Sequence, residues 1–225
     1  RLPEAVQADG SVVINWRTDI FPLQWRTATT WISWFFILNL FTPLTFSEKG
    51  PQEAGRLGMA LTVFGSITTV GMSWVNAKFP LMGQHVARGE HAVLRQLFRT
   101  ALVRALAVNA LVSMVFVALV WGLGWWGSPW VMRLAGLDVL LLLALVTVIN
   151  TAVFSMSTYM RAYREEPMQT PSVVLAFAVG IMALYTSPWG MTAMMSGYAL
   201  LCAVLSLPWT VLLWRGYLKR GADGH

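Results

Sequence analysis

The chain has 225 residues, of which 56% are hydrophobic and only 12% are charged, and its formal net charge is +6. Soluble domains carry about 25% charged residues, so this composition excludes an ordinary soluble fold. The single cysteine, Cys202, excludes a disulfide within the chain and a multi-cysteine metal site. The excess of Lys and Arg lies at the ends of apolar runs, as in loops of membrane proteins, and does not indicate binding to nucleic acid.

Six apolar runs are long enough to cross the ~30 Å hydrocarbon layer of a bilayer at ~1.5 Å per residue of helix. We expect one membrane-spanning helix in each, at residues 27–46, 57–77, 100–126, 134–160, 171–187 and 190–214. The predicted fold class is therefore all-α, a polytopic membrane protein. It has an interfacial segment at residues 1–26, a transmembrane part at 27–214 and a cytoplasmic tail at 215–225. Pro43 and Pro208 fall inside the first and last runs and are expected to kink them.

The distribution of Lys and Arg predicts the orientation. Of the 16 basic residues, all but Lys49, Arg56 and Arg133 belong to the two ends of the chain or to the second and fourth loops and their flanks. An even number of spans puts both ends on one side, and the Lys/Arg excess marks the cytoplasmic side, so we expect both termini in the cytoplasm. Amphipathic segments at residues 11–26 and 81–102 are expected to form either interfacial helices or ordinary solvated loop helices. Because the chain begins with Arg, we expect a fragment or a processed product.

Polar side chains recur every three or four residues in two of the runs, which places each set on one helical face. The second run contributes Thr62, Ser66, Thr69, Ser73 and Asn76, the fourth contributes Thr147, Thr151, Ser155 and Thr158, and the first adds Asn39. A polar face at membrane depth meets protein or a hydrated cavity, because lipid accepts no hydrogen bonds. The alternative is close helix packing through small Ser and Thr side chains. Two stripes on different helices favour a cavity, and these ten residues are candidates for lining it.

Residue patterns for catalysis or metal binding are weak. No Gly-x-Ser-x-Gly motif occurs, His85 and His91 fall in a predicted cytoplasmic loop, and His225 is the last residue. No cluster of Asp or Glu accompanies these histidines. We therefore expect no enzyme activity, no bound metal and no cofactor.

Five short segments carry a resemblance to a known family: PLQWR at 22–26, WISWFF at 31–36, GPQEAGRLGM at 50–59, WVNAKFP at 74–80 and ARGE at 87–90. Through them the chain resembles the second half of bacterial polysaccharide-biosynthesis flippases. These are the O-antigen and lipid-linked oligosaccharide exporters of the multidrug/oligosaccharidyl-lipid/polysaccharide superfamily. The resemblance implies one six-helix lobe of a twelve-helix transporter in the bacterial inner membrane, with the N-terminal lobe absent from this chain.

In that family, basic residues that face a central cavity hold the pyrophosphate of a lipid-linked glycan. The resemblance implies Arg26, Arg56, Lys78 and Arg161 as candidate substrate-binding residues, although each is also explained as a charge that sets topology. The expected function is to flip a lipid-linked oligosaccharide or polysaccharide across the membrane for cell-surface glycan biosynthesis. Its expected partners are the bilayer, the lipid-linked glycan and the N-terminal lobe.

Two alternatives stay open. The chain is a drug or metabolite exporter of the same superfamily, although no acidic residue lies deep in a span to couple transport to ions. Or it is a membrane subunit of a glycan-assembly complex that transports nothing itself. Stripes used only for packing would favour the latter.

Overall fold

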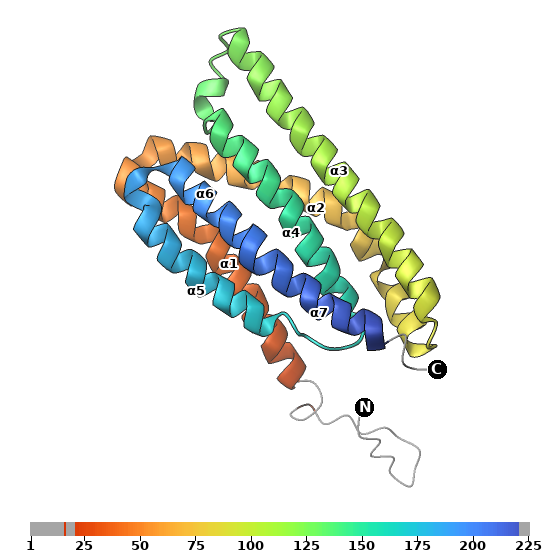
Figure 1. The fold of residues 1–225 in the computed structure, drawn as a ribbon. Helices are drawn as coiled ribbons and strands as arrows, with labels where there is room; N and C mark the ends of the chain where they lie inside the picture. The colour runs from red at the N-terminus through yellow and green to blue at the C-terminus, as the bar shows by residue number, and fades with distance from the viewer. Residues whose placement is uncertain (1–15, 17–20, 221–225) are drawn as a thin grey trace.

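The structure is a computed structural model, and it describes Trp16 and residues 21–220 (Figure 1). Most of the predicted interfacial segment at 1–26 and the last five residues of the predicted tail lie outside the described residues. The helices are α1 (Phe21–Lys49), α2 (Pro51–Ala87), α3 (His91–Trp125), α4 (Leu137–Arg161), α5 (Gln169–Thr186), α6 (Met191–Leu201) and α7 (Leu207–Arg220). The π-helical turn η4 (Cys202–Ser206) joins α6 to α7 without a break, so six helical rods make up the described part, with no strand in it. The predicted all-α fold is confirmed.

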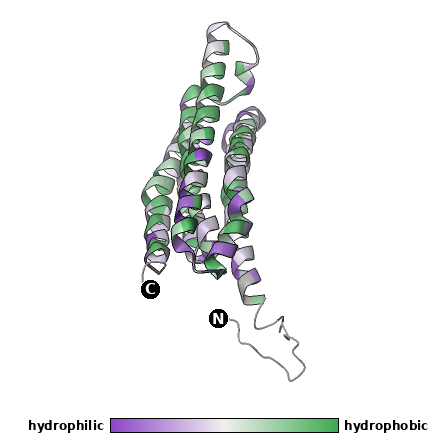
Figure 2. Cartoon of the chain, turned by 90° about the vertical axis from the view of Figure 1, so that its right-hand side faces the viewer, coloured by the Kyte–Doolittle hydropathy of each residue, from purple (hydrophilic) through white to green (hydrophobic). Residues whose placement is uncertain are grey.

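Five of these rods are long and apolar enough to cross a membrane: α2, α3, α4, Gln169–Trp189 and Met191–Lys219. Figure 2 shows the long hydrophobic stretches along them. The prediction of a multi-pass membrane protein is confirmed at this level. α1 is not among the five, but its 29 residues extend over about 44 Å and it packs against α2 and α5. α1 is therefore long enough to cross the hydrocarbon layer beside the membrane-spanning helices α2 and α5.

Glycines mark two of the turns. Gly50, with a φ of 87°, separates α1 from α2, and Pro51 follows at the first position of α2, where its missing N–H costs no hydrogen bond. Gly89, with a φ of 71°, separates α2 from α3 in a turn of only three residues. The prediction of a distinct amphipathic helix at residues 81–102 is therefore wrong. α2 continues to Ala87 and α3 begins at His91. The segment is therefore divided between the ends of two long helices, which the short turn at Gly89 separates.

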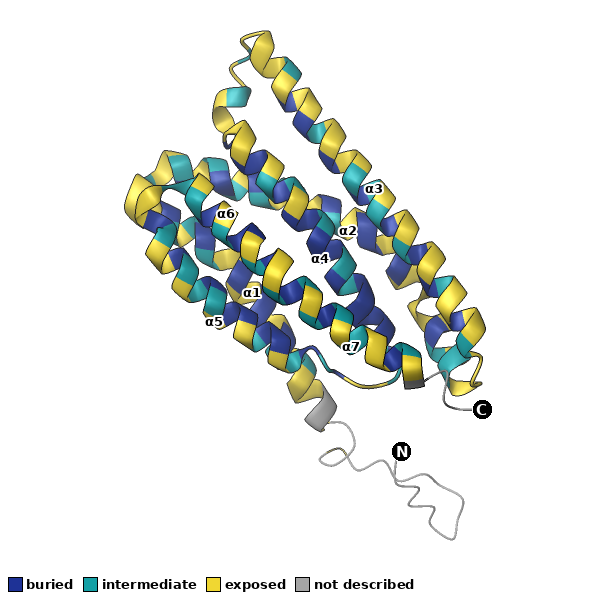
Figure 3. Cartoon of the chain, viewed as in Figure 1, coloured by how far each residue is buried: buried dark blue, intermediate teal, exposed yellow. Residues whose placement is uncertain are grey.

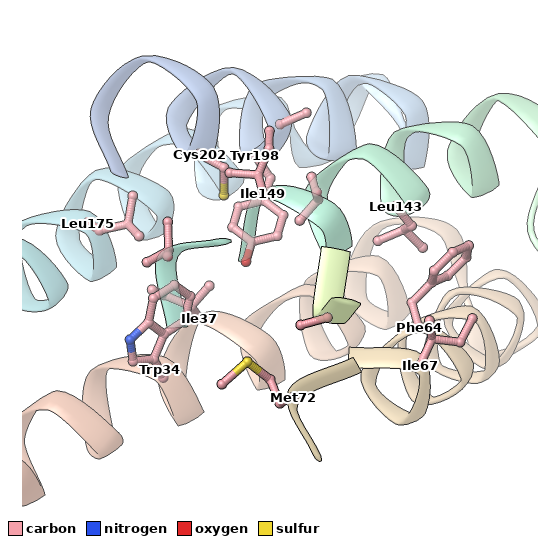
Figure 4. Packing of buried hydrophobic residues seen from close by; sticks show 14 of the residues in the cluster. Trp34, Ile37, Phe64, Ile67, Met72, Leu143, Ile149, Leu175, Tyr198 and Cys202 are labelled. Carbon is pink, nitrogen blue, oxygen red and sulfur yellow. The ribbon is translucent and has the colours of Figure 1, made fainter. Parts of the chain in front are cut away.

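α4 occupies the centre of the bundle, in contact with α2, α3, α6 and α7. Figure 3 shows nearly continuous buried colouring along the second half of α4, whereas its first turns and the outer side of α3 carry exposed residues. Buried residues from α1, α2, α4 and α6 belong to one core, in which Figure 4 shows Phe64 and Leu143 toward one side and Ile37 and Tyr198 toward the other. The core therefore fixes which face of each helix points outward.

The two prolines expected to kink their helices, Pro43 and Pro208, lie in different local structures. α1 is one helix through Pro43. Pro208 lies just after the π-helical turn at Cys202–Ser206. Because proline has no N–H to donate to the carbonyl four residues earlier, the backbone before it readily adopts a different hydrogen-bond register. The structure thus has a π turn just before Pro208, and a kink at this proline stays a prediction.

Candidate functional site

The polar residues of the fourth predicted span lie inside the bundle. Thr147, Thr151 and Ser155 are buried, and each hydroxyl donates to the carbonyl four residues earlier, at 2.6, 2.9 and 2.7 Å. Thr158 is buried as well and donates to the carbonyl of Phe154 at 2.9 Å. All four meet protein rather than open water. For this stripe the packing interpretation fits better than the cavity, because α4 is enclosed by its neighbours.

The polar residues of the second predicted span lie on the outer surface of α2. Thr62, Ser66, Thr69, Ser73 and Asn76 are all exposed, on the side of α2 away from its buried residues. The hydroxyls of Thr62, Ser66 and Thr69 donate to carbonyls of the preceding helical turn at 2.8 to 3.0 Å. We call these five residues the α2 polar stripe. Its oxygens remain free to accept hydrogen bonds from water or from a ligand.

The outer faces of α3 and α5 have a different chemistry. On α3 the exposed side chains from the middle of the helix include Leu111, Met114 and Leu119, and on α5 they include Phe177 and Ile181. Such faces suit lipid, whereas a row of hydroxyls and an amide does not. At mid-helix, the α2 polar stripe therefore departs from a lipid-facing composition, whereas the outer faces of α3 and α5 do not. Asn39 is also exposed, on α1, and its amide donates to the carbonyl of Phe35 at 2.9 Å.

The four candidate basic residues do not form one cluster. Arg56 lies near the start of α2, at the end of the bundle that carries the α1–α2 and α3–α4 connections. Its guanidinium donates to Glu53 and to the carbonyl of Met132, both at 2.7 Å. Together with Trp121 and Trp125 it lines a hollow of about 520 Å³. Arg56 is thus separated from the other three candidates by the length of the helices.

Arg26, Lys78 and Arg161 lie toward the opposite end. Arg161 is held by the buried carboxylate of Glu166, which accepts from Nε at 2.6 Å and from Nη2 at 3.2 Å. Its guanidinium also lies 6.0 Å from the centre of the Trp31 ring. Arg26 and Lys78 are exposed and form no ion pair with any described residue. At this end of the bundle, Arg26 and Lys78 are therefore the candidates whose positive charge is available to bind a ligand.

Asn109 is a buried polar residue that the periodicity of the sequence did not single out. It lies in the middle of α3, fully buried, and its amide donates to the Thr151 hydroxyl at 2.8 Å. The available signal in the sequence is Asn109 with Ser113 four residues later, a pair on one helical face within an apolar run. The contact links α3 to α4 beside Gly71 of α2, so it belongs to the packing of the bundle.

Groups of His, Cys, Asp or Glu that could hold a metal ion do not occur within the described residues. The imidazole of His85 instead contacts the carboxylate of Glu90 at 2.6 Å across the α2–α3 turn. The described chain therefore offers no cluster for metal chemistry.

The fold and the apolar helices define an all-α, multi-pass membrane protein. No protein-family model matches this chain, and neither does any curated protein or any solved structure. Any function beyond this class must therefore be argued from the surface of the bundle and from the sequence motifs.

Proposed function

We propose that this chain is one lobe of a membrane transporter that flips a lipid-linked glycan across the bacterial inner membrane. The observation that carries the proposal is the α2 polar stripe. Five polar side chains face outward from the middle of an apolar helix, whereas the outer faces of α3 and α5 are apolar in the middle of those helices. A second lobe placed against this side would enclose the stripe in a hydrated cavity. The sequence resemblance to polysaccharide flippases supplies the substrate class.

The proposed mechanism needs no covalent chemistry. A hydrated, positively charged passage lowers the cost of moving a pyrophosphate-sugar head past hydrocarbon while the lipid tail stays in the bilayer. Arg26 and Lys78 are exposed, without an ion-pair partner among the described residues, at one end of the bundle. They are suited to attract the pyrophosphate at that end, and alternating access between two lobes would then carry it along the stripe.

A second candidate function follows from the hydrogen bonds of the stripe. The hydroxyls of Thr62, Ser66, Thr69 and Ser73 all donate to the backbone of their own helix. A helix with internally satisfied hydroxyls can also pack tightly against another membrane helix. In that case the chain is a non-transporting subunit of a glycan-assembly complex, and the stripe is its interface.

Thiol labelling separates the two functions. With the buried Cys202 replaced by Ala, we expect a cysteine at Ser66 of the full-length protein to react with a small hydrophilic thiol reagent, because thiolates form in water. A cysteine at Leu111 is the matched control, since Leu111 is equally outward but on the apolar face of α3. We expect it to stay unlabelled. Labelling at Ser66 is further expected to stop the appearance of glycan at the cell surface.

Protection of Ser66 together with normal export would reject the hydrated passage. A different outcome would support the assembly subunit. In that outcome a cysteine at Ser66 stays unlabelled, yet substitutions in the α2 polar stripe stop the appearance of glycan at the cell surface, as expected for a packed interface. Labelling at both Ser66 and Leu111 would show that the reagent does not distinguish the two faces, and the inference from the outer faces of α2 and α3 would fail.

The orientation is a separate proposal, which the bias of Lys and Arg supports. With both ends of the chain in the cytoplasm, we expect an impermeant thiol reagent added outside to label cysteines at Gln52 and Ser128. A cysteine at Ala87, an exposed residue at the end of α2 next to the α2–α3 turn, is expected to react only after the cells are opened. The reverse pattern would invert the proposed orientation.

A further inference from the structure

Two arginines lie on the outer face of α3, within its first four turns. Arg99 and Arg104 line a hollow of about 400 Å³ together with Gln96, Thr100 and Val103. This face is opposite the buried side of the helix, which carries Leu94, Phe98, Ala101 and Ala105. The two guanidiniums therefore point away from the bundle, toward the surroundings of the protein.

The positive charge at this hollow is not compensated by the described residues. Neither Arg99 nor Arg104 forms an ion pair there. Between residues 88 and 104 the only acidic residue is Glu90, and its carboxylate contacts His85 instead. The hydroxyl of Thr100 donates to the carbonyl of Gln96 at 3.0 Å, so the donors available to a ligand belong to the two guanidiniums and the Gln96 amide. This set of donors, which includes two positively charged guanidiniums, favours the binding of an anion.

The depth of the hollow follows from the length of α3. Trp121 lies near the far end of the helix with its side chain exposed, as is typical of a residue at the membrane interface. At ~1.5 Å per residue, Arg104 lies about 26 Å from Trp121 and Arg99 about 33 Å. The hydrocarbon layer is ~30 Å thick, so Arg104 lies just inside the opposite edge of this layer and Arg99 lies just outside it. Lipid phosphates lie at this level.

An apolar ridge continues from the hollow toward the middle of the membrane. Beyond Arg104 the outer face of α3 is formed by Ala107, Leu111, Met114 and Ala118, all exposed. Hydrocarbon chains pack against such a ridge, whereas a soluble anion gains nothing from it. The hollow and the ridge together therefore match a molecule with an anionic head and apolar tails.

We propose that the outer face of α3 binds an anionic phospholipid. The phosphate sits between the guanidiniums of Arg99 and Arg104, and the acyl chains lie along the ridge from Ala107 to Ala118. On the proposed orientation this lipid belongs to the cytoplasmic leaflet. The site is on a different helix from the α2 polar stripe and does not depend on the transport function.

The test is the retention of lipid by the purified full-length protein. Reconstituted with equal amounts of phosphatidylglycerol and phosphatidylethanolamine and examined by native mass spectrometry, the wild type is expected to retain phosphatidylglycerol preferentially. The double variant Arg99→Gln/Arg104→Gln is expected to retain it roughly thirtyfold more weakly, because each basic residue near an anionic surface contributes about a factor of five. Arg99→Lys/Arg104→Lys is expected to keep part of the preference, since the charge remains without the planar fork.

The matched control is Arg215→Gln/Lys219→Gln. It removes the same charge from exposed positions on α7, at the same end of the bundle. An equal loss in this control would show general charge attraction and overturn the proposal, as would unchanged retention in Arg99→Gln/Arg104→Gln. Inorganic phosphate at about 10 mM is expected not to displace the lipid, because it lacks the tails that pack on the ridge. Displacement by phosphate alone would identify a site for a free anion and overturn the lipid assignment.

Discussion

Replacing Arg161 with Ala is expected to lower the free energy of unfolding by about 3 kcal/mol, because it leaves the carboxylate of Glu166 buried without its partner. The Glu166 side chain is only 1% exposed, and both of its oxygens accept from the Arg161 guanidinium. An unpaired charge at such a position costs far more than the pair contributes. The measurement is unfolding of the purified protein by increasing mole fraction of SDS in mixed micelles.

Arg56→Ala is the matched control for this effect. Arg56 also pairs with a Glu, but the side chain of that partner, Glu53, is 33% exposed, three residues away on the same helix. Water can solvate Glu53 when the arginine is gone, so even with the loss of the hydrogen bond to the carbonyl of Met132 we expect a smaller loss, of about 1–2 kcal/mol. Equal losses in the two variants would contradict the distinction drawn from burial. In Arg161→Met/Glu166→Gln, where no charge remains, most of the stability is expected to return.

The same variants bear on substrate binding. Arg161 was a candidate for holding pyrophosphate, but its guanidinium is already held by Glu166. A loss of export in Arg161→Ala would therefore be explained by instability. If Arg161 does contact the substrate, the stable variant Arg161→Met/Glu166→Gln is expected to fail in export while remaining folded. Normal export in that variant would remove Arg161 from the binding site and leave Arg26 and Lys78 as the candidates at this end.

The spacing of polar residues in the sequence showed which of them share a helical face, but not where that face points. Thr62 and Ser66 on α2 have the same spacing as Thr151 and Ser155 on α4. The structure puts the first pair outside and the second pair inside. The direction of a face depends on the neighbouring helices: α4 is enclosed by α2, α3 and the continuous α6–α7 rod, whereas the face of α2 that carries Thr62 and Ser66 has no neighbouring helix in the described part of the chain. Periodicity within one segment contains no information about these neighbours.

The pairing of Arg161 with Glu166 illustrates a second limit. The two residues are five apart and separated by the end of α4. Arg164 has a φ of 59° in the connection to α5, and this left-handed residue lies in the turn between the two partners. A non-glycine residue in that conformation is uncommon, so the sequence did not predict the turn. By contrast, the apolar runs were long enough to locate the helices by hydropathy alone, because the bilayer sets their length.

The second large effect is expected at Gly71, where a side chain on α2 would meet α3 at close range. A Cβ at this position would lie 3.2 Å from the Cβ of Asn109 and 3.3 Å from the carbonyl oxygen of Ala105. The Ala105 oxygen is backbone and cannot rotate away. A larger side chain therefore has to push the two helices apart, and it also displaces Asn109 from its 2.8 Å hydrogen bond to Thr151.

We expect Gly71→Leu to lower the free energy of unfolding by roughly 3 kcal/mol or more, since overpacking costs about 1–3 kcal/mol and an unsatisfied buried amide costs about 1–3 kcal/mol. Gly65→Leu is the control on the same helix: apart from its own stretch of helix, no part of the described protein lies within 4 Å of a Cβ at Gly65. There, replacing glycine within a helix is expected to leave stability unchanged or to raise it by up to about 1 kcal/mol. Unfolding by SDS measures both variants, and Gly71→Ala is expected to fall between them. If Gly71→Leu unfolded at the same SDS mole fraction as Gly65→Leu, the close contact between α2 and α3 at Asn109 would be refuted.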